Sequence, residues 1–126
     1  MILVFALSPK SLILALAQID GQIEETRDAT WQVGSGRSVA LGVNTLMLDS
    51  GTKLDQLRRI VVVDQGGSYT SARTAFAFAN AFAWIRQLPI ILIQPDSNES
   101  FESTVLRAVS LPDSRLPITP SYETSK

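Results

Sequence analysis

The stretch Asp64-Gln65-Gly66-Gly67-Ser68 is the part of the chain whose residue types most resemble a reactive or ligand-binding site. Paired glycines before a helix can form a loop whose backbone amides hold a phosphate group. The spacing does not complete Gly-x-Gly-x-x-Gly, and neither a Gly-Lys-Ser/Thr sequence nor an acidic ribose partner about 20 residues further on follows. We therefore interpret the stretch as a tight turn from a strand into a helix, with Ser68 as the N-cap, where backbone amides could attract an anion weakly.

Other catalytic groups are scarce in this sequence. Asp64 is the one carboxylate in a plausible position, and a lone carboxylate at a strand end is more often a helix cap or a loop anchor than a catalytic group. The chain has no His and no Cys, which removes the usual general base, the thiol nucleophile and the commonest zinc ligands. We expect a protein without catalytic activity, cofactor or metal site.

The elements around Asp64 form a strand–helix–strand unit. Ile60 to Val63 is a β-branched run typical of a strand buried on both faces. Residues 69–87 contain no Gly or Pro and predict a helix of about five turns, which Leu88-Pro89 ends. Ile90 to Ile93 predicts a second buried strand, parallel to the first through a right-handed crossover.

The predicted helix 69–87 is apolar nearly all round, and three faces can be distinguished on it. The bulky face expected to cover the sheet contains Phe78, Phe82 and Ile85. The ridge of small residues, which lets another helix approach closely, contains Ala72, Ala75, Ala79 and Ala83. The polar arc contains Arg73, Asn80 and Gln87 together with Ala77 and Trp84. Either the second helix of this chain or a partner covers the alanine ridge.

The first half of the chain predicts a three-stranded meander and a helix. Strands are expected over 2–7 and 12–17, and Asp20-Gly21 marks a hairpin leading to a charged edge strand over 22–27. A polar loop follows over 28–37. A helix over 39–48 should begin at Ser38 as N-cap and end near Ser50-Gly51.

The segment from Thr52 to Ile93 carries a family resemblance. Gly67-Ser68-Tyr69-Thr70-Ser71-Ala72-Arg73 resembles the Gly-Pro-Gly-Ser-Phe-Thr-Gly-Leu-Arg signature of the TsaB (YeaZ) family, in which an Ala-rich helix and a hydrophobic strand follow. The resemblance implies a non-catalytic relative of the actin-like ATPases. Such proteins pair with a catalytic homologue, TsaD, in making the threonylcarbamoyladenosine of transfer RNA.

The first hairpin turn departs from the actin-like ATPase pattern. There an Asp helps to hold metal and phosphate, and by alignment it falls on Ala6, with the following Thr on Leu7 and only Ser8 retained. An aliphatic pair cannot supply the oxygen ligands of a hard cation. The same loss argues against a ribonuclease H-like nuclease, which needs several converging carboxylates.

Composition limits the remaining classes of partner. A net charge of −1 gives no reason to expect direct nucleic-acid binding. The apolar N-terminal stretch is interrupted by Ser8-Pro9-Lys10 and has no uninterrupted span of the ~20 residues of a membrane helix. We therefore expect a cytoplasmic protein with neither a signal peptide nor a membrane segment.

The predicted fold class is α/β: a five-stranded mixed sheet in the order third, second, first, fourth, fifth, forming the ribonuclease H-like half of an actin-like protein. Residues 1–95 are expected to be the TsaB N-terminal-like domain. Residues 96–126 are expected to be a linker, a short helix near 101–111 and a proline-rich tail. The second actin-like subdomain of the family is not expected in this chain.

The predicted function is that of a TsaB-like partner subunit in threonylcarbamoyladenosine modification. Its partner would be a TsaD-like protein, a second copy of the chain, or both, bound through helices 38–50 and 69–87. The residues predicted at this interface are Val43, Met47, Tyr69, Arg73, Ala77, Asn80 and Trp84. The alternative is a degenerate actin-like enzyme that still binds a nucleotide near Asp64 and Gly66-Gly67.

Overall fold

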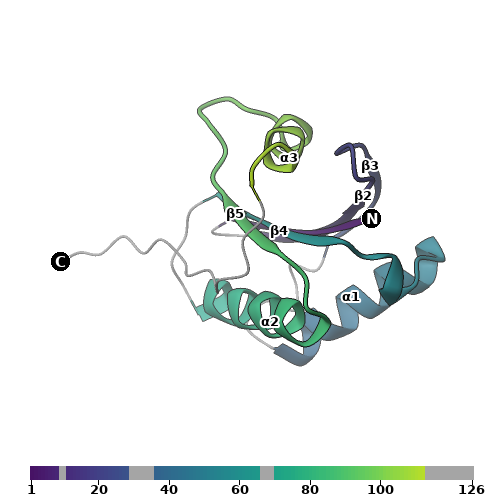
Figure 1. Cartoon of the computed structure of the whole chain (residues 1–126). Coiled ribbons are helices and arrows are strands. Elements are labelled where there is room, and N and C mark those ends of the chain that lie inside the picture. Colours follow the sequence, from purple (N-terminus) through teal and green to yellow (C-terminus); the bar gives the residue numbers. More distant parts are fainter. Residues whose placement is uncertain (9–10, 29–35, 66–69, 113–126) are drawn as a thin grey trace.

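A five-stranded sheet forms the centre of the computed structural model, which describes residues 1–8, 11–28, 36–65 and 70–112. Two long helices, α1 (Gly36–Ser50) and α2 (Thr70–Arg86), cover one face of the sheet. The shorter α3 (Phe101–Val109) lies on the opposite face (Figure 1). A 3-10 turn, η2 (Leu54–Gln56), lies between α1 and the strand Arg59–Asp64.

The strands follow the predicted topology. They are β1 (Ile2–Ser8), β2 (Ser11–Ala17), β3 (Ile23–Asp28), β4 (Arg59–Asp64) and β5 (Ile90–Ile93). Their order is β3-β2-β1-β4-β5. The pairs β1–β2 and β2–β3 are antiparallel, whereas β1–β4 and β4–β5 are parallel. The α/β class, the mixed sheet and the strand order are all confirmed.

One helix boundary differs from the prediction. α1 begins at Gly36, so Ser38 lies within its first turn and the prediction of Ser38 as N-cap is wrong. At the other end, Gly51 adopts φ 71°, and the amide of Thr52 donates to the carbonyl of Met47 (3.1 Å), which terminates α1 as predicted. The Gly66-Gly67-Ser68 turn, Tyr69, most of the polar loop and the proline-rich tail lie outside the described residues.

Alternating side chains of the strands build two hydrophobic cores, one on each face of the sheet. On β1, Leu3, Phe5 and Leu7 pack under α1 and α2. The intervening residues, Ile2, Val4 and Ala6, belong to the second core, which α3 completes. This alternation is the period of two expected of a strand, applied here to a sheet that is apolar on both sides.

The rotation of α2 about its axis differs from the prediction. Ala75, Ala79 and Ala83 are buried in the main core, and α2 contacts β1, β4 and β5. The alanine ridge therefore faces the sheet. Of the bulky face expected to cover the sheet, Phe78 does meet Phe5 of β1, with ring centroids 6.1 Å apart, but Ile85 is 73% exposed.

The hairpin between β2 and β3 is tied to α3. Gly21, at φ 96°, forms the turn, and its amide donates to the carbonyl of Gln18 (2.8 Å). A Cβ atom at this position would lie 2.9 Å from Cδ2 and 3.2 Å from Cα of Leu106 in α3. Gly21 is thus required both by its backbone conformation and by the close approach of α3.

The helix α3 belongs to the folded domain. Val105 and Ala108 are fully buried in the second core, and Arg59 of β4 donates to the carbonyl of Val109 (3.1 Å). The helix predicted near 101–111 is confirmed. The predicted domain boundary at residue 95 would separate it from the sheet on which it packs, so the domain extends at least through α3.

A charged cluster fixes the start of α3. Ser100 caps the helix by accepting from the amide of Ser103 (3.1 Å). The Arg107 guanidinium donates to both carboxylate oxygens of Glu99, at 2.8 and 3.1 Å. This contact, together with the hydrogen bond from the backbone amide of Asp96, lowers the pKa of Glu99 to about 2.

Candidate functional site

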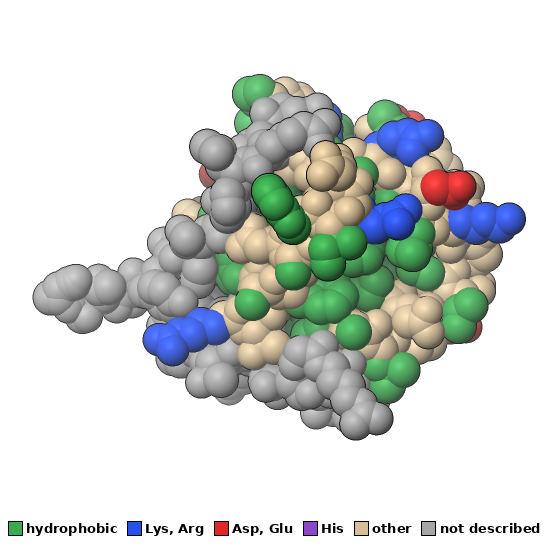
Figure 2. Space-filling view, turned by 60° about the horizontal axis from the view of Figure 1, so that its bottom comes forward, with side chains coloured by type: hydrophobic (Ala, Val, Ile, Leu, Met, Phe, Trp, Pro, Cys, Tyr) green, Lys and Arg blue, Asp and Glu red, His purple; other side chains and the backbone are tan. Residues whose placement is uncertain are grey.

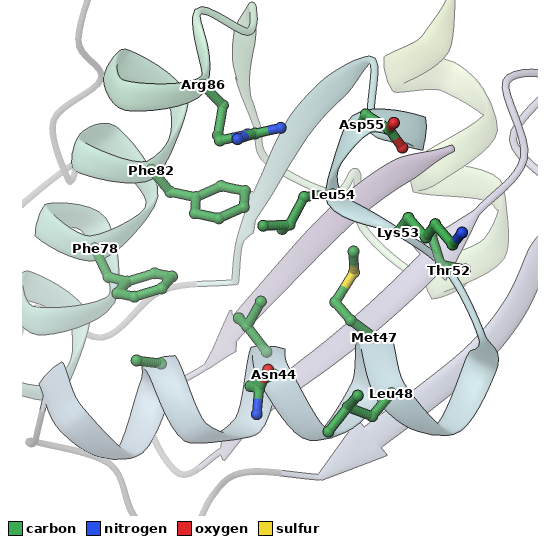
Figure 3. A pocket seen from close by; sticks show the side chains of 12 residues that line it. Asn44, Met47, Leu48, Thr52, Lys53, Leu54, Asp55, Phe78, Phe82 and Arg86 are labelled. Atoms are coloured by element: carbon green, nitrogen blue, oxygen red, sulfur yellow. The ribbon is translucent and has the colours of Figure 1, made fainter.

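A groove runs between α1 and α2 on the face of these helices that points away from α3. It has a volume of about 640 Å³ and is closed at one side by η2 (Figure 3). Its lining residues are Ala40, Val43, Asn44, Met47, Leu48, Thr52, Lys53, Leu54, Asp55, Phe78, Phe82 and Arg86. This volume lies within the range of about 300–1,000 Å³ that is usual for binding pockets.

The centre of the groove is apolar and partly aromatic. Phe78 and Phe82 project from α2 toward α1, and their rings stack with centroids 5.9 Å apart (Figure 3). Met47 of α1 and Leu54 of η2 approach from the other side. Both phenylalanines are only half-buried, so their outer surfaces are available to an apolar group entering the groove.

One end of the groove carries charge. Arg86, the last residue of α2, projects toward η2, where Lys53 and Asp55 lie (Figure 3). All three residues are exposed, and within the described residues none of their side chains has an ion-pair partner. The groove thus combines an apolar middle with an end that carries two cations and one carboxylate.

Large apolar side chains are exposed on the outer surfaces of α1 and α2. Trp84 is 76% exposed and Leu48 is 72% exposed, while Leu41 and Ile85 are also more than half exposed. Figure 2 shows hydrophobic side chains gathered over α1 and α2, with Lys and Arg side chains at the border of the cluster. Apolar groups clustered in this way on one face are typical of a surface that binds another protein.

The predicted interface residues differ in how far they are exposed. Trp84, Ala77 and Arg73 are exposed, as expected. Asn80 is half-buried, and Tyr69 lies outside the described residues.

Val43 and Met47 lie deeper than the other predicted interface residues. The interface residues were expected on helix faces turned away from the sheet or at the rim of those faces, and these two are 4% and 6% exposed and belong to the main core. They touch the groove from below, as part of its lining. The reason is that α1 has several apolar positions and the sheet takes the stripe that contains Val39, Val43, Leu46 and Met47.

Of the residues that line the groove, only Val43 and Met47 were predicted at the interface. Phe78 and Phe82 were assigned to the sheet-covering face, and Leu54 and Arg86 were assigned no part in binding. The apolar Leu54 beside Lys53 and Asp55 in a short polar segment is a signal that could have drawn attention to η2. The position of η2 beside α2 depends on the tertiary structure. The parallel crossover from β4 through α2 to β5 brings α2 next to the segment that precedes β4.

The neighbouring ends of β1 and β4 are the place where actin-like ATPases hold metal and phosphate. In this chain they carry the aliphatic residues Ala6, Leu7 and Val63 together with Asp64. In the parallel pair β1–β4, Ala6 is in register with Val63 and Leu7 with Asp64. Asp64 is buried, at 4% exposure, and does not lack an interaction partner. In the part of the chain that the structure describes, no three His, Cys, Asp or Glu residues come together in a group that could hold a metal ion.

The helices of the described segments were compared with the requirements of a membrane span. None of their helices combines the length and the hydrophobicity that a bilayer span requires. Although α2 is apolar over much of its surface, it has 17 residues, and one of its faces is occupied by the sheet.

Comparisons with known proteins concern the fold. No protein-family model matches the sequence, and no curated protein matches it. The structure of YeaZ from Pseudomonas aeruginosa matches with a TM-score of 0.62 and 19% identity, covering 75% of this chain and 44% of that one. A structure described as an uncharacterized protein with similarity to peptidase YEAZ from Pseudomonas aeruginosa gives the same TM-score and identity, covering 75% and 43%.

These matches confirm the expected YeaZ-like fold over three quarters of the chain. At 19% identity the likeness is one of architecture. The chain spans less than half the length of either structure.

Proposed function

We propose that this chain is a TsaB-like, non-catalytic subunit that binds a partner protein through the face formed by α1 and α2. The partner on this proposal is a TsaD-like protein or a second copy of the chain. The process is the threonylcarbamoyladenosine modification of transfer RNA in the cytoplasm. The chain contributes a binding surface, and the TsaD-like partner performs the chemistry.

One observation carries the proposal: a YeaZ-like fold whose helices α1 and α2 expose Trp84, Leu48 and Ile85 and form an apolar groove between them. Leaving such side chains in water forgoes the favourable free energy of burying them, which is about 1.5–3 kcal/mol for each large apolar side chain. A protein partner that covers the face recovers this free energy. The threonylcarbamoyladenosine role itself rests on the sequence resemblance to the TsaB family around Gly67 to Arg73.

The non-catalytic assignment rests on the residues of the sequence. The chain has no His or Cys, and Ala6 and Leu7 replace the oxygen ligands that actin-like ATPases use at the first strand. The alternative, a nucleotide-binding remnant around Asp64, is tested directly by isothermal titration with ATP and Mg²⁺. A clear single-site isotherm would favour that alternative.

The proposal is tested by mixing the purified chain with the TsaD-like protein of the same organism and measuring the molar mass by light scattering after gel filtration. We expect a complex, and we expect Trp84→Ala and Ala77→Glu to weaken it. Threonylcarbamoyl transfer to transfer RNA by the TsaD-like protein should increase when the chain is added, and less so with the variants.

Leu106→Ala is the matched control for Trp84→Ala. Leu106 is also a large exposed apolar residue, at 52% exposure, but it lies on α3 on the opposite face of the sheet. Its removal should leave the complex unchanged. Equal weakening of the complex by both variants would mean that the binding face is wrongly assigned. A chain that forms neither a complex with the TsaD-like protein nor a dimer with itself would contradict the proposal.

A further inference from the structure

The groove between α1 and α2 has an apolar part and a charged end. Phe78, Phe82 and Met47 line the apolar part, whereas Lys53 and Arg86 lie toward η2 (Figure 3). Along α2 the lining extends from Phe78 to Arg86, which corresponds to about 12 Å at a rise of 1.5 Å per residue. The site is therefore elongated, and the charged residues of its lining lie toward one end.

The apolar part has room for a slender alkyl chain. Val43 and Met47 form its floor and are buried, at 4% and 6% exposure, whereas the rings of Phe78 and Phe82 are half-buried and form one wall. Leu54 of η2 stands opposite them and is 44% exposed. An alkyl chain that displaces water from these surfaces gains the free energy of apolar burial.

The end next to η2 carries a net positive charge. Within the described residues, the side chains of Lys53 and Arg86 have no ion-pair partner, and Asp55 is the one carboxylate of the lining. Arg58 adds a third cation on the same turn, because its guanidinium donates to the backbone carbonyl of Asp55 (2.8 Å). Three cations beside one carboxylate favour an anionic group at this end.

From these observations we propose that the α1–α2 groove binds a small amphipathic anion, a free unbranched carboxylate of medium chain length. The alkyl chain lies along Phe78 and Phe82 with Met47 beneath it, and the carboxylate lies at the end that carries Lys53 and Arg86. This inference goes beyond the proposed function and does not rest on it, because it concerns a small molecule bound to the chain alone.

The length of the groove sets the first test. Binding of octanoate, decanoate, dodecanoate and tetradecanoate to the full chain is measured by isothermal titration calorimetry, below the concentrations at which micelles form. We expect a dissociation constant of the order of 0.1 mM for decanoate, and an affinity that rises about tenfold from octanoate to decanoate as two methylene groups are added.

The affinity should then level off by tetradecanoate, because the longer chain extends beyond a groove of about 12 Å. An affinity that continues to rise with each added pair of methylene groups would indicate unspecific adsorption to the exposed apolar side chains of the surface. That result would overturn the inference.

The charge of the head group sets the second test. Decanoate should bind about tenfold more tightly than decyltrimethylammonium at low salt, with a preference that shrinks as salt screens the charges. Arg86→Gln should weaken decanoate about threefold and leave the neutral decanol unchanged, and Arg86→Lys should retain the affinity. Equal losses for decanoate and decanol would mean that Arg86 acts through packing, and the carboxylate position would be wrong.

Filling the groove sets the third test. Ala40 is exposed and lines the groove, so Ala40→Phe should place a ring in it and weaken decanoate at least about tenfold. Ala77→Phe is the matched control, because Ala77 is also an exposed alanine of a helix but does not belong to the lining. It should change the affinity by less than about twofold. Urea midpoints show that both variants are folded, and equal effects on binding would overturn the inference.

Other occupants of the groove give distinct outcomes. Co-sedimentation with vesicles of phosphatidylcholine and phosphatidylglycerol, without binding of free decanoate, would assign the face to a lipid bilayer and overturn the inference. A dimer in sedimentation equilibrium that excludes decanoate would overturn it as well. Absence of saturable decanoate binding at about 1 mM, ten times the expected dissociation constant, has the same meaning.

The two proposals fail separately. A chain that binds decanoate but neither a TsaD-like protein nor a second copy of itself would support the carboxylate site and contradict the proposed function. A chain that binds the TsaD-like protein but not decanoate would do the reverse.

Discussion

Replacing Ala79 with Leu tests how closely α2 packs on the sheet. Ala79 has no exposed surface and lies between Ala75 and Ala83 on the face of α2 that enters the main core. Leucine adds three carbon atoms at this position. If the core had room for them, their burial would stabilise the fold by about 0.8 kcal/mol per carbon, or roughly 2 kcal/mol.

The structure predicts the opposite sign. A close-packed interior has no free volume for three carbons, so the helix must shift or the side chain must leave its preferred rotamer, at a cost of about 1–3 kcal/mol. A loss of about 2 kcal/mol lowers the urea midpoint by about 1 M at a typical slope of about 2 kcal/mol/M. A domain with an ordinary stability of about 5–15 kcal/mol remains folded after this loss, so the midpoint can be measured.

Ala77→Leu is the matched control, because it makes the same change two residues earlier on the exposed side of α2. It should change the stability by less than about 0.5 kcal/mol. Urea unfolding of both variants and the parent chain is followed by far-ultraviolet circular dichroism at one protein concentration. Stabilisation by Ala79→Leu, or an equal loss from both variants, would show that the alanine ridge does not face the sheet.

Three further changes test other parts of the structure by the same urea assay. Gly21→Ala should cost about 1–3 kcal/mol, because φ is 96° and the new Cβ would lie 2.9 Å from Leu106; a neutral result would contradict the close approach of α3. Arg86→Ala should cost less than about 0.5 kcal/mol, since the side chain is exposed, and a larger loss would mean that Arg86 has a structural role. The pKa of Glu99 is lowered to about 2 in the fold, so its contribution should be present above its usual value of 4.5 and be lost as pH falls toward 2. Glu99→Gln should therefore reduce the fall in stability over this pH range, and an unchanged acid dependence would contradict the Arg107 contact.

The sequence alone determined the class of the fold and the order of its strands. Ile60 to Val63 and Ile90 to Ile93 are short β-branched or aliphatic runs with turn or proline signals beside them, so their strand state follows from local chemistry. The Asp20-Gly21 turn fixes β2 and β3 as neighbours, and the crossover through α2 makes β4 and β5 parallel. Each of these signals spans a few adjacent residues, which is why they can be read without the structure.

The orientation of each helix required the tertiary structure. Beyond a narrow polar arc with Arg73 and Asn80, α2 has alanine or phenylalanine on almost every side, so its sequence does not show which apolar face meets the sheet. Facing alanines to the sheet brings the helix backbone close to the strands and leaves Phe78 and Phe82 to fill the space toward α1. The choice depends on how side-chain volumes fit across three elements, and the sequence of one element does not contain that information.

The binding groove was likewise decided by the tertiary structure. Its residues come from α1, η2 and α2, and up to 46 positions separate Ala40 from Arg86. The apolar helices in the sequence indicated that some surface would need a partner, and the exposed Trp84 agrees with that expectation. Which residues form the surface depends on packing between distant segments, because Val43 and Met47 are drawn into the core while Leu54 and Arg86 are brought to its edge.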